Sequence, residues 1–297
     1  MTGTSEVVTR EVVSPDGARV HVLDHRTTGD GDLPTLVLAH GWTLDQSSWA
    51  RVVSALQQRH AVRVVTYDQP GHGLSTLGRG RRATVRDLGE TLRAVLCEVV
   101  PDGPLVLGGH SMGGMTVMAY AGAHPDELHE RARGVLLMAT TPELASLRRP
   151  IRGEGVVMGL QSVLPSAVPS LPMSRDMVRR ATFGADEPDP RDLAHVVSMG
   201  RATSARATGR YFSALQGHDE IGSLGVFAGI PTVVLAGERD RLTPARWSRM
   251  YHERIPGAAL DVVPRAGHML AYEATDRVVE HLEDLLLGRP LRSSPTP

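Results

Sequence analysis

The pentapeptide Gly-His-Ser-Met-Gly at positions 109–113 constrains the fold of this chain more than any other feature. Apolar residues at 105–107 precede it, and an apolar, helix-like segment over 112–123 follows it. This order predicts a buried strand, a sharp turn and a helix, with the hydroxyl of Ser111 standing clear of the sheet. Because the chain has 31 glycines, Gly-x-Ser-x-Gly is expected by chance about 0.2 times, so the turn needs support from its surroundings.

Strand-like and helix-like segments alternate on both sides of this turn. We expect strands at 35–39, 61–67, 104–109, 134–139, 231–236 and 259–263, and helices at about 46–58, 85–99, 112–123 and 275–287. Such alternation predicts a mainly parallel sheet with helices on both faces. Residues 7–13 and 18–24, which flank a Pro-Asp-Gly turn, predict a β-hairpin at the N-terminus.

The expected helix over 85–99 carries its own start signal. Thr84 is suited to cap its N-terminus, and Asp87 follows three residues later, as in a capping box. Cys97 is the single cysteine of the chain and falls in this helix. We expect it to be a partly buried, small apolar side chain and not a reactive thiol.

Two residues of the types that activate a serine nucleophile also follow predicted strands. Asp240 comes directly after the strand at 231–236, and His268 comes after the strand at 259–263. A serine nucleophile needs a histidine base, and the histidine needs an acid that fixes its tautomer. Because the carboxyl ends of parallel strands meet at one edge of a sheet, these residues are predicted to lie near Ser111. Glu238 and Glu143 are alternative acids, since they also lie near strand ends.

With these residues the chain resembles the α/β-hydrolase fold family, in which the triad follows the order Ser, Asp, His. Residues 36–42 are similar to its first parallel strand and oxyanion loop, and residues 64–75 to its next strand and D-x-x-G-x-G-x-S turn. The resemblance implies an α/β fold with a mostly parallel sheet. It also implies a hydrolase core formed by residues 1–142 and 219–297, and a helical cap inserted at 143–218 over the active site.

The resemblance also implies a role for each site residue. Ser111 would be the nucleophile, His268 the base and Asp240 the acid, because the family's G-x-x-D pattern fits Asp240 and not Glu238. The backbone N–H groups of Met112 and Trp42 would form the oxyanion hole. The Trp42 ring and Met269 are expected to contact the substrate, although the ring could also serve packing alone. Other polar residues near the site are expected to position loops and not to transfer protons: His40, His110, Asp68 and His72.

Composition excludes several other functions. The net charge of −1 without a basic block gives no reason to expect binding to nucleic acid or to an anionic membrane. No run of about 18 apolar residues and no apolar leader occurs, so we expect no membrane span and a cytoplasmic location. All 32 basic residues are arginine and asparagine is absent, which excludes Schiff-base lysines and a Cys-His-Asn triad. The histidines lack metal-ligand spacing and no dinucleotide fingerprint is present, so neither a metal nor a cofactor is expected.

The predicted function is a serine hydrolase that cleaves a carboxylic ester, lactone or thioester through an acyl-enzyme. Serine at position 111 disfavours alkyl-halide and epoxide opening, where related enzymes carry aspartate, but leaves C–C bond hydrolysis and perhydrolysis open. An acyltransferase, cyclase or biosynthetic thioesterase with the same acyl-enzyme is an alternative, and a non-catalytic ligand-binding relative is another. Methionine and leucine are frequent in residues 143–218, which fits either a small-molecule substrate with an apolar part or simple packing of the cap. We expect a monomer or a homodimer.

Overall fold

The computed structural model of the 297-residue chain describes residues 5–29, 33–80, 82–144, 153–170, 173–185 and 187–293. Parts of the insert expected over 143–218, namely 145–152, 171–172 and 186, therefore lie outside the described residues. Among the helices that are described, none is both long and apolar enough to cross a membrane.

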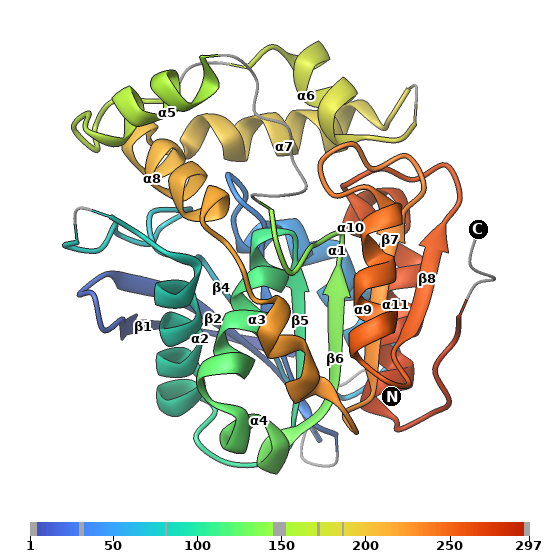
Figure 1. Ribbon diagram of the computed structural model, residues 1–297. Coiled ribbons are helices and arrows are strands. Elements are labelled where there is room, and N and C mark those ends of the chain that lie inside the picture. Colours follow the sequence, from blue (N-terminus) through green and yellow to red (C-terminus); the bar gives the residue numbers. More distant parts are fainter. Residues whose placement is uncertain are drawn as a thin grey trace.

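An eight-stranded sheet forms the centre of the molecule, with the strand order β1-β2-β4-β3-β5-β6-β7-β8 (Figure 1). The pairings of β1 with β2 and of β2 with β4 are antiparallel, and all others are parallel. The α/β class and the N-terminal hairpin are thus as predicted. The strands have these bounds: β1 (Ser5–Val13), β2 (Arg19–Thr27), β3 (Thr35–Ala39), β4 (Val64–Tyr67), β5 (Leu105–His110), β6 (Ala132–Met138), β7 (Thr232–Gly237) and β8 (Ala259–Val263).

Helices cover both faces of the sheet because its central strands are apolar on both sides. Every residue of β4, β5 and β7 is buried. On one face, α2 (Val85–Val99) and α3 (Met112–Ala123) pack into one core cluster. On the other face, α1 (Ala50–Arg59), α10 (Leu270–Glu273) and α11 (Thr275–Leu286) form the second cluster.

The expected capping box at Thr84 and Asp87 is present in α2. The expected partial burial of Cys97 was wrong, because its side chain is exposed on the solvent side of the same helix. The helix expected at about 46–58 begins as a 3-10 turn, η1 (Gln46–Trp49), and continues as α1. Short elements that the sequence pattern did not reveal are α4 (Pro125–Arg131), η2 (Ile221–Phe227), η3 (Ala245–Ser248) and α9 (Arg249–Arg254).

Between β6 and β7 the described chain forms four helices above the carboxyl ends of the strands (Figure 1). They are α5 (Glu154–Ser162), α6 (Arg175–Thr182), α7 (Pro190–Ala202) and α8 (Ala205–Gln216). Apolar residues of α6 and α7, with Phe183, form a third cluster together with Leu44 and Met269 of the loops below. The helices between β6 and β7 therefore rest on the loops that follow β3 and β8.

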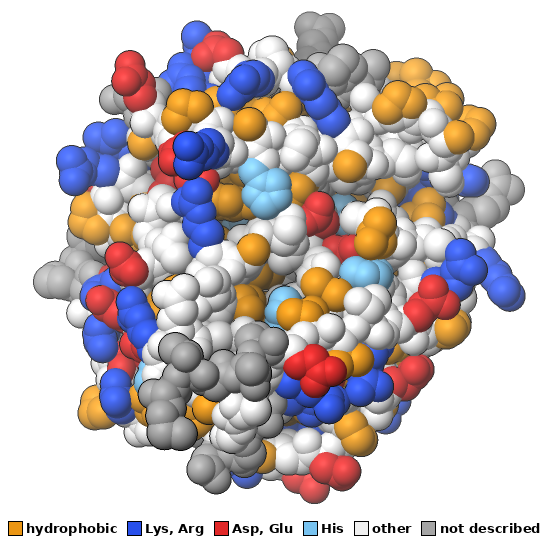
Figure 2. Space-filling model, turned by 180° about the vertical axis from the view of Figure 1, so that it is seen from behind, with side chains coloured by type: hydrophobic (Ala, Val, Ile, Leu, Met, Phe, Trp, Pro, Cys, Tyr) orange, Lys and Arg blue, Asp and Glu red, His pale blue; other side chains and the backbone are white. Residues whose placement is uncertain are grey.

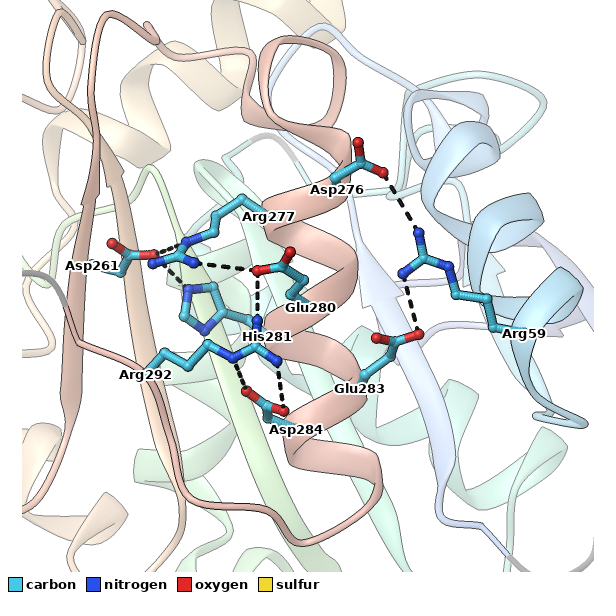
Figure 3. A network of polar contacts seen from close by, with 9 residues as sticks. All are labelled: Arg59, Asp261, Asp276, Arg277, Glu280, His281, Glu283, Asp284 and Arg292. Atoms are coloured by element: carbon cyan, nitrogen blue, oxygen red, sulfur yellow. Dashed lines mark hydrogen bonds and ion pairs between the residues drawn. The ribbon is translucent and has the colours of Figure 1, made fainter.

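The polar side of α11 is held by a network of charged groups (Figure 3). Asp261 of β8 is buried and accepts hydrogen bonds from Arg277 at 2.6 Å and His281 at 2.6 Å. Removing charges from water is costly unless they are paired, and both partners satisfy this carboxylate. On the same helix, Glu280 and Asp284 bind Arg292. The network fastens edge strand β8, α11 and the segment after it to one another.

Candidate active site

Ser111 occupies a strained turn between β5 and α3. Its backbone has φ 52° and ψ −117°, a conformation that residues other than glycine rarely adopt. Such a residue costs on the order of 1–3 kcal/mol and persists only where its surroundings enforce it. The Ser111 N–H donates to Met138 O at 2.9 Å, and its carbonyl accepts from Thr140 Oγ1 at 2.7 Å and Met115 N at 3.1 Å. The sheet and α3 together hold the turn.

The two glycines of the pentapeptide are required by close backbone contacts. A Cβ placed on Gly109 would lie 2.3 Å from the carbonyl oxygen of Gly113. A Cβ on Gly113 would lie 2.1 Å from Ala39 O and 2.8 Å from His40 O. Backbone atoms cannot move away from such a contact as a flexible side chain could. The pattern Gly-x-Ser-x-Gly is therefore a steric condition for bringing α3 against the loop after β3.

His268 and Asp240 meet at the same end of the sheet. The Nδ1 atom of His268 lies 2.8 Å from Asp240 Oδ2, and both side chains are buried. Thr243 Oγ1 donates to the same carboxylate oxygen at 2.8 Å. The backbone of His268 is fixed as well, since its N–H donates to Thr182 O at 2.7 Å and its carbonyl oxygen lies 2.9 Å from His110 Nε2.

Burial alone would raise the pKa of Asp240, but the charge and hydrogen bond of His268 and the donors of Thr243 outweigh it. The pKa of Asp240 is therefore lowered, and the carboxylate is ionised at neutral pH. The carboxylate can then accept a hydrogen bond from Nδ1–H of His268, which leaves Nε2 as the basic nitrogen of the ring.

Neither alternative acid has a comparable position. Glu238 is exposed, and its carboxylate accepts the backbone N–H of Arg265 at 2.8 Å. Glu143 pairs through its backbone with Asp219, where the insert rejoins the sheet region. Of the three carboxylates, Asp240 is the one that the structure places against the His268 ring.

The loops after β3 and β5 bring Trp42 and Met112 to this edge. Met112 is the first residue of α3, where backbone N–H groups have no partner within the helix. The whole residue is buried, and it follows Ser111 directly in the chain. The Trp42 ring is partly buried and lies 6.0 Å from the ring of Phe212 on α8.

Three histidines near the site are buried and neutral. Burial lowers the pKa of His40 to about 4 and that of His72 to about 3. For His110, burial and then the nearby charge of His268 lower the pKa to about 3. Such groups do not exchange protons near neutral pH. Asp68 accepts the N–H groups of Gln46 at 2.8 Å and Leu74 at 2.9 Å and so ties two loops together.

A cavity of about 400 Å³ joins Ser111 and His268 to the helices above them. Trp42 and Met269 contribute to its floor. Its upper wall is mainly apolar and includes Met158, Met177, Val178, Val197, Phe212 and Leu215. The cavity can hold a molecule with an apolar part next to Ser111.

The methionines and leucines of the insert do not share one role. Met158, Met173 and Met177 line the cavity, whereas Met199 is buried in the cluster below α7. Leu160 on α5 and Leu164 just after this helix are exposed, and apolar side chains gather in this part of the molecule at the upper right edge of Figure 2. Leu171 lies outside the described residues. Neither a purely substrate-binding nor a purely packing role describes the whole set.

Several partners of the site were not found from the sequence. Thr243 follows Asp240 by three residues, and its N–H and hydroxyl both bind that carboxylate. This spacing is typical of an Asp-led turn and could have indicated the contact. Thr140 and Thr182 reach the site from distant segments, and no local pattern marks them. Within the described part of the chain, no group of three or more His, Cys, Asp or Glu residues could hold a metal ion.

Comparisons with known proteins show the family to which the chain belongs. The sequence model described as "Alpha/beta hydrolase family" matches residues 36–281. A pimeloyl-[acyl-carrier protein] methyl ester esterase of Chromobacterium violaceum is 31% identical over 278 residues, covering 86% of this chain and 96% of that protein. The dihydrolipoyllysine-residue acetyltransferase component of the acetoin cleaving system of Pseudomonas putida is 31% identical over 268 residues. The match covers 86% of this chain but only 63% of that longer protein.

Solved structures show the same architecture. The enol-lactonase from Burkholderia xenovorans LB400 superimposes with a TM-score of 0.77 at 23% identity, covering 94% of this chain and 100% of that one. The chain belongs to the alpha/beta hydrolase family. The predicted fold class and the predicted family are confirmed.

Proposed function

We propose that this chain is a serine hydrolase in which Ser111, His268 and Asp240 form the catalytic triad. It is a carboxylic ester hydrolase of its family, in agreement with the prediction, and its substrate is a small molecule. The observation that carries the proposal is the 2.8 Å contact of His268 with Asp240 beside a cavity that His268 shares with Ser111. The strained backbone of Ser111 adds to this, because strain of this kind is characteristic of functional turns.

The proposed reaction follows from these positions. Ser111 Oγ attacks the acyl carbonyl carbon and gives its proton to Nε2 of His268, while Asp240 accepts the Nδ1 proton in a hydrogen bond. The backbone N–H groups of Met112 and Trp42 stabilise the negative oxygen of the tetrahedral intermediate. His268 then protonates the leaving alcohol or thiol, and an acyl-enzyme remains. Water activated by His268 releases the acid and restores Ser111.

We further propose that residues 143–218 act as a cap that selects the substrate, and that Trp42 and Met269 contact its acyl part. The mainly apolar wall of the cavity supports an ester, lactone or thioester with an apolar acyl group. The names of the relatives mention a methyl ester esterase and an enol-lactonase, which supports the first two classes. A monomeric or homodimeric state and a cytoplasmic location stay predictions.

The test is a screen of p-nitrophenyl esters of increasing chain length, thioesters and lactones with three proteins. We expect hydrolysis by the wild type and by Ser54→Ala, an exposed serine on α1, and none by Ser111→Ala. A fluorophosphonate should label the protein once, on Ser111, and mass spectrometry detects the label. A folded wild type without activity or label would contradict the proposal, as would an active Ser111→Ala variant. Adding an alcohol separates hydrolysis from acyl transfer, because transfer yields a new ester.

A further inference from the structure

We infer that Gln69 is a positioning residue that sets the spacing between the two segments proposed to form the oxyanion hole. Gln69 lies in the turn after β4 and its side chain is fully buried. It does not line the cavity that contains Ser111 and His268. The inference rests on the proposed function, because it assigns Gln69 a role in the same reaction through the backbone of Trp42 and Met112.

The side-chain amide of Gln69 bridges two segments that are distant in sequence. Its Nε2 donates to His40 O at 2.5 Å, and its Oε1 accepts from Thr116 Oγ1 at 2.8 Å. A flipped amide would place its oxygen against the carbonyl oxygen of His40, so these partners fix its orientation. One end of the amide therefore holds the loop after β3, and the other end holds α3.

The backbone of Gln69 adds a second bond to the same loop. Its N–H donates to Nε2 of His40 at 2.8 Å, while Nδ1 of His40 lies 2.8 Å from Gly41 O. These contacts assign the neutral ring with its proton on Nδ1, and burial lowers the pKa of His40 to about 4, in keeping with a neutral ring. Gln69 thus holds both the ring and the carbonyl of the residue that lies two positions before Trp42.

At the other end, Thr116 belongs to the first turns of α3. Its hydroxyl lies 2.9 Å from Met112 O as well as 2.8 Å from Gln69 Oε1. Gly113 lets the carbonyl groups of Ala39 and His40 approach the start of this helix directly. Loop and helix therefore meet backbone to backbone, and the Gln69 amide is a polar bridge across that contact. The distance between the N–H groups of Trp42 and Met112 depends on this bridge.

This role predicts a particular kinetic signature. Oxyanion donors act on the charge that develops in the transition state, so a small displacement of either segment lowers kcat more than it changes KM. Methionine at position 69 keeps the length of the side chain but removes both hydrogen bonds. We expect Gln69→Met to lower kcat for p-nitrophenyl butyrate about tenfold, with KM within about twofold. Inhibition by phenylboronic acid, which forms a tetrahedral adduct with the serine, should weaken by a similar factor.

A matched control separates positioning from stability. Gln57 on α1 also bridges two backbone carbonyls, those of His25 and Val62, at 3.3 and 3.2 Å, remote from Ser111. Gln57→Met should lower Tm while kcat stays within about twofold. A folded Gln69→Met protein that loses Tm but keeps its kcat would overturn the inference, because Gln69 would then act on stability alone.

Thr116→Val is a second, milder test. It replaces Gln69→Met if that variant does not fold. It removes the hydroxyl that binds Oε1 and should lower kcat about threefold, and unchanged kcat would again overturn the inference. In the double variant the two losses should be less than multiplicative, because both substitutions break the same bridge. Failure of the proposed function looks different. In that case wild type itself would show neither ester hydrolysis nor labelling of Ser111.

Discussion

The Asp240 carboxylate is enclosed by hydrogen-bond donors on both of its oxygens. Oδ1 accepts the N–H groups of Leu242 at 2.8 Å and Thr243 at 3.0 Å, and Oδ2 accepts Thr243 Oγ1 and His268 Nδ1. The turn that carries Asp240 is therefore built around its charge. An amide at this position would offer an N–H to His268 in one orientation and disturb the turn in the other.

Asp240→Asn should lower kcat by about 10³- to 10⁴-fold, because the wrong tautomer of His268 would be favoured. Steady-state hydrolysis of p-nitrophenyl butyrate measures this, and circular dichroism checks that the variant is folded. Glu238→Gln is the matched control and should keep normal turnover, since Glu238 faces solvent and binds only Arg265 among the contacts described. Near-normal turnover of Asp240→Asn would move the acid role to another carboxylate.

At this scale the sequence predicted that Ser111, Asp240 and His268 lie at one end of the sheet, where the structure places them, but not which residues support them. Each of the three follows a strand-like run, and parallel strands end together. Thr243 and Gln69 could not be assigned, because their importance comes from side-chain contacts with the site. Thr182 reaches His268 from a helix of the insert, and no pattern within either segment indicates that contact.

At the scale of elements, the junction of β3, β5 and α3 decides whether the site can form. The pattern of the pentapeptide predicted the strand, the turn and the helix with nearly the observed bounds. The short helix α4 and the 3-10 segments η2 and η3 were missed because four to seven residues give too little periodicity. The helices of the insert were expected without bounds. Which of their residues are buried depends on how they pack on the loops below.

Gly113→Ala should prevent this junction from closing. Its Cβ would meet the backbone of Ala39 and His40 at 2.1 and 2.8 Å, so either the loop or the helix must shift. We expect a lower Tm and a loss of at least tenfold in kcat, measured by thermal unfolding and ester hydrolysis. Gly225→Ala in η2 is the control, because nothing lies within 4 Å of the added Cβ. Equal behaviour of the two variants would refute the steric argument.

At the scale of the whole molecule, buried histidines couple stability to pH. The pKa of His40 and of His218 is lowered to about 4, and that of His72 and of His110 to about 3, in each case mainly by burial. In the unfolded chain these groups have pKa values near about 6.5, so the unfolded state binds more protons below that pH. Their contribution to stability is therefore complete above about pH 6.5 and is lost as the pH falls toward the folded values.

The free energy of unfolding should thus decrease between pH 7.5 and pH 5.5, by on the order of 1 kcal/mol for each of these histidines. Urea unfolding followed by tryptophan fluorescence at several pH values measures the slope. His72→Gln should reduce that slope by an amount that corresponds to about one proton fewer taken up on unfolding. Asp240, whose pKa is also lowered, adds a further loss only in more acidic solution. A free energy of unfolding that is constant over this range would contradict the prediction.

The cavity is a property of the whole molecule, and the sequence did not give its shape. The methionines and leucines of the insert were compatible with either an apolar pocket or simple packing of the cap. Which of them face the cavity depends on how α5 and α8 pack, where Gly209 meets the backbone of Met158 and Ser162. Contacts of this kind join residues far apart in the chain, and side-chain composition does not encode them.

The bond between His268 and Thr182 also limits how a substrate can reach the serine. Glu273 accepts the N–H groups of both Gly184 and Gly267, and Arg239 binds Gly184 O. The segment at the end of α6 is therefore tied to the loop that carries His268. If α6 lifted away, it would pull His268 away from Asp240. We therefore expect substrate and product to enter and leave beside α5, whose surface is largely exposed. A molecule built in this way would exchange substrate and product while His268 stays bound to Asp240.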